Sequence, residues 1–176
     1  MAETAGITIG GSLNSVVVPI IDWEMTEHSA VREVHTIGSM SPVDSFATLV
    51  TLDGKVTFIA DASTFEDLAD LSKDTDGVLP DFAVIIGTYK HTGCKVSNLT
   101  INASLEQELR ASISWQALAK GTDTNPGAPS SVEAFKCIKL TATGVGATVH
   151  ASTIDITVSN GLKAVHSMNA TGSRLP

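Results

Sequence analysis

The sequence predicts an all-β protein: a mainly antiparallel β-sandwich or barrel with one short flanking α-helix. Segments rich in β-branched residues recur along most of the chain, and several alternate apolar and polar residues as half-buried strands do. Glycine- and asparagine-containing turns separate these segments, and only one stretch has helical spacing together with a helix start. The length fits a single domain, residues 1–176, with a flexible N-terminus.

The first strands are predicted at residues 15–23 and 32–38. The first segment is β-branched, but Pro19 cannot donate a ladder hydrogen bond, so we expect an edge strand or a bulge there. The second segment alternates and ends on Gly38, which favours a strand followed by a turn.

A tight hairpin is predicted around Asp53 and Gly54, between strands at residues 46–52 and 55–60. The Asp-Gly pair favours the positive φ angles of a type I′ turn, and the twist of that turn matches the flanking strands of a hairpin.

One helix is predicted to start at a capping box formed by Ser63 and Glu66. Phe65, Leu68 and Leu71 follow at helical spacing, so one narrow face is apolar. A helix this short is not stable alone, and we therefore expect it to pack on the sheet.

The central strands are predicted at residues 82–88 and 95–102, the second with Val96, Asn98, Thr100 and Asn102 on the face opposite Leu99. Residues 105–120 fit both a helical spacing and an alternation. We interpret them as a strand from about Leu109, because Ala111, Ile113 and Trp115 alternate with Arg110, Ser112 and Ser114.

The C-terminal third begins with a predicted exposed loop at residues 121–131, which contains two prolines. Strands are then expected at 132–142 and 148–158. The remaining residues, about 160–176, are polar and irregular, and we interpret them as a C-terminal arm.

Composition and charge restrict the possible functions. Hydrophobic residues make up 43% of the chain and charged residues 17%, which fits a subunit that buries its outside against neighbours; a compact monomer with a Ser/Thr surface is the alternative. The net charge of −8 disfavours binding to a phosphate backbone. Residues 1–5 do not resemble a signal peptide, and the apolar run 16–21 is too short to span a bilayer, so we expect a cytoplasmic origin with reduced cysteines and no membrane insertion.

No catalytic, cofactor or metal site is predicted, and we expect no enzyme activity. His91 and Cys94, with Cys137, lack a suitable fourth metal ligand, so core filler and a surface imidazole fit them better. Trp23 and Trp115 are better core anchors than sugar platforms in a chain with so few aromatics. Two groups of acidic residues fit solvated turns better than a calcium loop or an acid–base pair. These groups are Asp22, Glu24 and Glu27 beside His28, and Asp74, Asp76 and Asp81.

The order of these elements resembles the major tail tube proteins of tailed bacteriophages. The similarity is greatest at residues 96–103 running into 111–115, and at residues 154–162 with the closing residues 172–176. The resemblance implies a β-sandwich that forms hexameric rings, in which strands from each subunit join a continuous inner barrel. It also implies stacking of the rings into a tube for genome ejection, in a virion tail assembled in the host cytoplasm. Implied partners are other copies of the chain, terminator, initiator or tape-measure proteins, and DNA that passes without specific binding.

Within that resemblance, the candidate lumen-facing residues are Thr100, Asn102, Ser112 and Ser114, although the solvent side of an ordinary sandwich explains them equally well. Loops 39–45 and 121–131 are the candidate contacts between rings. The C-terminal arm is the candidate contact between subunits. The candidate residues of this arm are Asn160, Gly161, Arg174 and Pro176.

Two other functions stay open from the residues alone. A binding module of adhesin or carbohydrate-binding type would use an exposed aromatic platform, and a hydrolase would use titratable groups that converge in a pocket.

Overall fold

The computed structural model describes separate segments of the chain. The described residues are 10–28, 31–34, 44–47, 50–60, 65–74, 76–129, 140–144, 147–162, 167–168 and 174–175.

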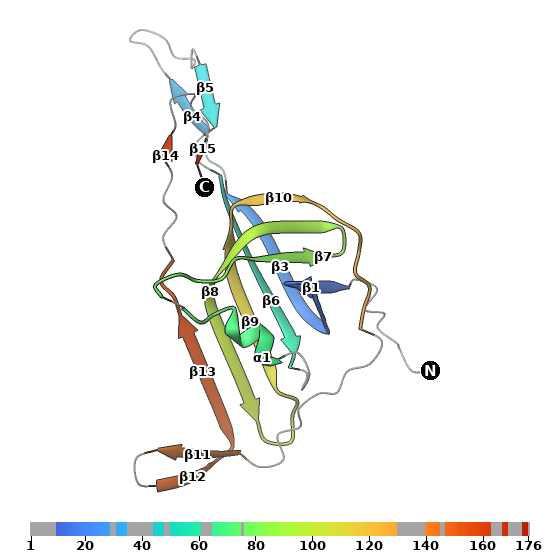
Figure 1. Cartoon of the computed structure of the whole chain (residues 1–176), viewed down its shortest axis with the longest axis vertical. Helices are drawn as coiled ribbons and strands as arrows, with labels where there is room; N and C mark the ends of the chain where they lie inside the picture. The colour runs from blue at the N-terminus through green and yellow to red at the C-terminus, as the bar shows by residue number, and fades with distance from the viewer. Residues whose placement is uncertain are drawn as a thin grey trace.

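The main layer of the fold is an antiparallel sheet of five strands. Its order is β3 (Ile20–His28), β6 (Thr51–Ile59), β9 (Arg110–Ala117), the second half of β8 (Tyr89–Ser104) and β13 (Thr153–Ser159). The strands of this layer run along the long axis of the molecule (Figure 1).

A second layer crosses the first and is joined to it through β8. It contains β2 (Val16–Val18), β1 (Gly11–Leu13), β7 (Phe82–Ile86), the first half of β8 and β10 (Ala119–Thr122). The two layers form one hydrogen-bonded sheet of nine strands because β8 is long enough to belong to both. The predicted fold class, mainly antiparallel β with a short flanking helix, is confirmed.

Three short two-stranded ladders lie outside this body. They are β4 (Val31–Val34) with β5 (Asp44–Ala47), β11 (Leu140–Gly144) with β12 (Ala147–Ala151), and β14 (Ser167–Met168) with β15 (Arg174–Leu175). The β4–β5 ladder and the β11–β12 ladder lie at opposite ends of the long axis (Figure 1).

The hydrophobic core lies between the two layers. Its largest fully buried side chain is Trp115 of β9, and Phe58 of β6 and Ile86 of β7 pack in the same cluster. Helix α1 (Phe65–Asp70) closes one side of this core, since Leu68 and the following Leu71 are buried in it. The helix is therefore where the sequence predicts it, although its capping residue Ser63 and the side chain of Phe65 lie outside the described residues.

The hairpin prediction at Asp53 and Gly54 is wrong, because both residues lie inside β6 and pair with β3 and β9. Gly54 lies opposite Trp115, and a Cβ added to Gly54 would come within 2.2 Å of Trp115 Cζ2. The glycine is needed for the close approach of the indole ring, and the turn that its dipeptide favours does not form.

The predicted alternation along β8 fails at one point. The register shifts between Val96 and Asn98, so Ser97 is an extra residue and Val96 is buried on the same side as Leu99. An inserted bulge residue changes which face the preceding side chains occupy. From Asn98 onward the predicted alternation holds.

The other predicted strands are found as β-structure, but two of them are divided: residues 148–158 form β12 and β13, which belong to different sheets, and residues 15–23 form β2 and β3. Pro19 separates β2 from β3, which are the edge strands of the two layers. β9 begins at Arg110 as a strand, and β10 includes Gly121 and Thr122 from the predicted loop. Several predicted ranges are only partly described. β4 covers the start of residues 32–38, and β5 covers the end of loop 39–45 and the start of residues 46–52. Residues 35–43, 48–49 and 130–139 lie outside the described part.

Candidate functional site

One face of the five-stranded layer is polar across all five strands. The cross-strand pairing aligns Thr157, Thr100, Ser112, Thr57 and Asp22 in one row. A second row carries only polar side chains too, and it reaches both edges of the layer. This second row consists of Ser159, Asn98, Ser114, Lys55 and Glu24. We call this surface the polar face.

All four predicted lumen candidates lie on the polar face. Thr100 is the cross-strand partner of Ser112, and both Asn102 and Ser114 lie on the same strands and the same side. Each of the four is half-buried by its neighbours in the sheet. The structure therefore brings the four residues together on one face of the sheet.

Hydrogen bonds between short side chains hold the polar face in a flat arrangement. The Thr57 hydroxyl donates to Ser112 Oγ at 3.3 Å, and the Ser104 hydroxyl lies 3.4 Å from Asn102 Oδ1. The Asn102 amide donates to the carboxylate of Asp155 on β13. Several polar side chains of this face therefore satisfy one another's hydrogen-bonding groups.

Most charges of the polar face lie on β3, β6 and β13. Its centre, on β8 and β9, carries hydroxyl and amide groups, with Arg110 at the start of β9. Four carboxylates face two cations around that centre. The carboxylates are Asp22, Glu24, Asp53 and Asp155, and the cations are Lys55 and Arg110. Such a surface repels phosphate groups weakly and offers them no basic cluster.

Two strands of this layer have a free edge within the described part of the chain. β3 pairs there only with β6, and β13 only with β8. The backbone N–H and C=O groups along a free edge are available to pair with another strand.

The C-terminal arm begins at Asn160, which three hydrogen bonds hold in place. The Asn160 N–H donates to Ser97 O at 2.9 Å, and its side-chain amide donates to Val96 O at 2.9 Å and to Ser72 O at 3.2 Å. The arm therefore leaves β13 from the bulge of β8 and the end of α1. Gly161 follows with φ +56°, in the left-handed region that glycine favours.

The remaining arm candidates are described only in part. Arg174 pairs with Met168 in the β14–β15 ladder, and Pro176 lies outside the described residues. The contact of the arm with another subunit stays a prediction.

His91 and Trp115 form a buried polar contact between the layers. Trp115 Nε1 donates to His91 Nδ1 at 3.1 Å, and the two rings meet edge to face at 81°. Burial lowers the pKa of His91, partly opposed by the nearby carboxylates of Asp53 and Glu27. The imidazole is therefore neutral and accepts the indole N–H, and the prediction of a surface imidazole is wrong.

Cys94 is buried beside this contact as predicted for core filler, and burial raises the pKa of its thiol to about 12. Cys137 lies outside the described residues. Within the described ranges, no three His, Cys, Asp or Glu side chains come together as metal ligands.

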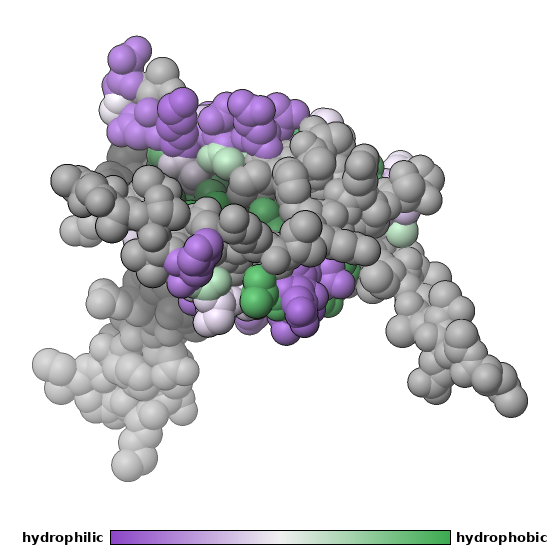
Figure 2. Space-filling view, turned by 90° about the horizontal axis from the view of Figure 1, so that it is seen from below, coloured by the Kyte–Doolittle hydropathy of each residue, from purple (hydrophilic) through white to green (hydrophobic). Residues whose placement is uncertain are grey.

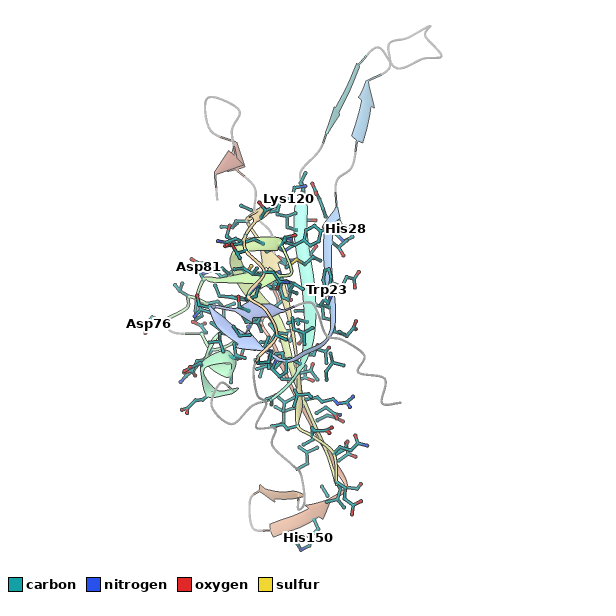
Figure 3. All side chains as sticks on the ribbon, turned by 90° about the vertical axis from the view of Figure 1, so that its right-hand side faces the viewer. Trp23, His28, Asp76, Asp81, Lys120 and His150 are labelled. Carbon is teal, nitrogen blue, oxygen red and sulfur yellow. The ribbon has the colours of Figure 1, made fainter. Side chains whose placement is uncertain are left out.

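The two tryptophans have different environments. Trp115 is a core anchor, as predicted. Trp23 is half-buried on the edge strand β3 (Figure 3), and its ring centroid lies 6.4 Å from that of Tyr89, which is 62% exposed. The contact of Tyr89 with Trp23 was not predictable, because the two residues are far apart in the sequence and no local pattern links them.

The acidic groups of the sequence lie in separate places. Asp22 and Glu24 lie on the polar face, whereas the carboxylate of Glu27 pairs with the ammonium group of Lys120. Asp76 and Asp81 lie on the side of the molecule away from Trp23 (Figure 3), and Asp81 forms an ion pair with Lys95 at 3.0 Å. A depression of about 380 Å³ near them is lined by Asp74, Gly77, Val78, Leu79, Lys95, Asn160 and Leu162.

No helix in the described ranges has the length and apolar character needed to cross a bilayer.

Comparison with solved structures finds chains of a sheath–tube complex and of a particle tail, at low sequence identity. A chain of the sheath–tube complex of an extracellular contractile injection system (PVC), in its extended state, is 7% identical with a TM-score of 0.46. The match covers 66% of this chain and 88% of that one. A chain from the tail of an empty GTA particle with C6 symmetry is 13% identical with a TM-score of 0.41, covering 66% of this chain and 95% of that one.

Comparison of sequences gives a more extensive match. No curated protein matches the chain. A family model described as phage tail tube protein matches residues 8–175, which is almost the whole sequence and includes every strand described above. The chain therefore belongs to the phage tail tube protein family, and it is a structural tail protein.

Proposed function

We propose that copies of this chain close into hexameric rings that stack into the tail tube, with the polar face turned toward the channel. The polar face is the observation that carries this proposal. It spans all five strands of the main layer, while the opposite side of the same sheet forms the core. A closed wall of this kind has one water-filled side and one packed side.

The chemistry of the polar face fits the passage of DNA. Hydroxyl and amide groups at its centre bond to one another, and the carboxylates at its margins outnumber the cations. A duplex carries a dense negative charge, so this wall would neither bind it nor stop it. The function is therefore transport without recognition, and it needs no catalytic residue, cofactor or metal.

Assembly of the tube needs contacts between subunits, between rings and with other tail proteins. The whole chain acts as one tube-forming domain, and the arm with Asn160, Gly161, Arg174 and Pro176 reaches a neighbouring subunit. Either loop 39–45 or loop 121–131 contacts the next ring, and terminator, initiator or tape-measure proteins contact the tube. Assembly takes place in the host cytoplasm, and the finished tube is part of the virion.

Electron cryo-microscopy of the purified, concentrated protein tests this function. We expect hollow tubes of stacked six-fold rings in which Thr100 and Ser112 line the channel. Tubes with the polar face on the outside would contradict the assigned face. Particles that remain monomeric even with an added tail initiator would contradict self-assembly and favour a binding module.

A further inference from the structure

An apolar strip is exposed on the free edge strand β13. Ile154, Ile156 and Val158 point to the core side of the layer, since they pair with Ala103, Ile101 and Leu99 of β8. Leu99 is 3% exposed, but Ile156 is 50% exposed and Val158 37%. The side chains of β8 are therefore covered at these positions, whereas those of Ile156 and Val158 on β13 are exposed. Hydrophobic side chains also reach the surface between hydrophilic ones in Figure 2, which views the molecule from below.

The opposite edge of the same layer has an aromatic counterpart on the same side. One cross-strand row runs through the whole layer and consists of Trp23, Val56, Ile113, Leu99 and Val158. Its three central members are almost completely buried, and its two ends are partly exposed. The row ends at one edge in Trp23 of β3, whose ring neighbours that of Tyr89 at the start of β8, and at the other edge in Val158 of β13.

The two edges cannot meet within one copy, because three strands separate them. They can meet between copies that share an orientation. Five successive antiparallel strands make β3 and β13 run in the same direction, so β13 of one copy would lie parallel to β3 of the next. Parallel pairing is slightly less stable per residue than antiparallel pairing, and apolar contacts beside the junction would compensate for this.

We propose that the strip formed by Ile154, Ile156 and Val158 docks on Trp23 and Tyr89 of a second copy of this chain. This inference rests on the proposed ring assembly and names the contact that joins neighbouring subunits. The occupant is a second copy because its edge matches this one: with Val158 beside Trp23 of the next copy, the apolar row would continue from one copy into the next. In the same register the polar rows would continue too, so side chains of like character would meet on both faces.

A charge placed on the strip tests the contact. Ile156→Asp buries a carboxylate at the junction, and we expect the protein concentration needed for assembly to rise at least about tenfold. Val78→Asp is the matched control: it introduces the same charge at another exposed apolar residue, which is 62% exposed in the loop before β7 and lies on neither edge strand, and it should assemble like the original chain. Thermal unfolding of both variants checks that the fold is kept.

The outcomes separate this inference from the proposed function. If Ile156→Asp assembles as readily as the unchanged chain, the docking contact is wrong and the tube function stands. If the unchanged chain forms no tubes under any condition, including with an initiator, both are wrong.

Photo-crosslinking gives an independent readout. A benzoylphenylalanine at Val158 reacts with C–H groups in contact with it, whatever the register of the strands. In tubes made from isotopically light and heavy chains, we expect mixed adducts on the peptides that contain Trp23 or Tyr89. Adducts only within one chain, or on other segments of the neighbour, would overturn the proposal.

Discussion

His91 and Trp115 form a buried contact between the two layers of the molecule, and this contact depends on the protonation state of the imidazole. Nδ1 accepts the indole N–H only while it carries no proton. Asp53 and Glu27 favour the protonated form, whereas Lys120 and, above all, burial disfavour it. The balance lowers the pKa of His91 below its ordinary value of 6.5.

Acid should therefore loosen the contact between the layers. Since the pKa of His91 is lower in the folded than in the unfolded chain, its stabilising contribution is complete above about pH 6.5 and is lost as the pH falls toward the lower, folded pKa. Urea unfolding across this range should show a smaller pH dependence for His91→Gln than for the original chain. Equal slopes for the two proteins would contradict the assignment.

Gly54 is the second residue on which Trp115 depends. In Gly54→Ala the new methyl group would lie 2.2 Å from Trp115 Cζ2, so the indole ring must shift. We expect a loss of about 1–3 kcal/mol in the free energy of unfolding, the usual range for an overfilled core. Gly121→Ala on β10 is the control, since a Cβ there meets nothing within 4 Å. A loss of equal size in both variants would show that the indole contact is not the cause.

At the scale of the elements, local patterns predicted most strands and the helix, because those patterns are set within a few residues. Leu68 and Leu71 indicate the buried side of α1, and the alternation of β9 predicts both its strand and its polar side. The prediction failed where a distant residue decides the structure. Gly54 lies in a strand because Trp115 covers it, and the bulge at Ser97 is bonded by Asn160, from the far end of β13.

Asn160 should accordingly stabilise three elements at once. Asn160→Ala removes the amide donors to Val96 O and Ser72 O while the backbone bond to Ser97 can remain. Two carbonyl groups would lose a partner, and we expect a loss of about 1–3 kcal/mol in the free energy of unfolding.

Asn98→Ala is the matched control for this prediction, because its amide makes one long bond of 3.4 Å to Thr100 on the polar face. Chemical unfolding should show a much smaller loss for Asn98→Ala. If the two variants lose the same free energy, Asn160 does not join these elements.

At the scale of the whole molecule, the candidate site was predictable in part. The polarity of Thr100, Asn102, Ser112 and Ser114 was evident from the alternation, and the structure places them on one face. The extent of that face, its carboxylate margins and the exposed strip on β13 were not predictable. They depend on which strands become neighbours, and the residues of one segment do not determine the order of strands in a sheet.

Positive charge on the polar face should slow DNA without preventing assembly. In Thr100→Lys with Ser112→Lys, two adjacent cations would face the channel, and tubes should retain short duplexes more strongly at low salt than at high salt. Thr88→Lys in the exposed turn after β7 is the control, and it should leave retention unchanged. Retention that is the same for both variants, or independent of salt, would contradict the channel assignment.

The acidic edge strand β3 has a consequence for the direction of the tube. A copy inserted upside down, with its polar face still inward, would place its β3 edge against the β3 edge of a neighbour. Asp22 and Glu24 of the two copies would then lie close together on the polar face, and like charges opposed across a strand pair are destabilising. Only copies that point the same way avoid this repulsion. A tube built from them is a polar filament with two chemically different ends, so a terminator and an initiator can each recognise one end.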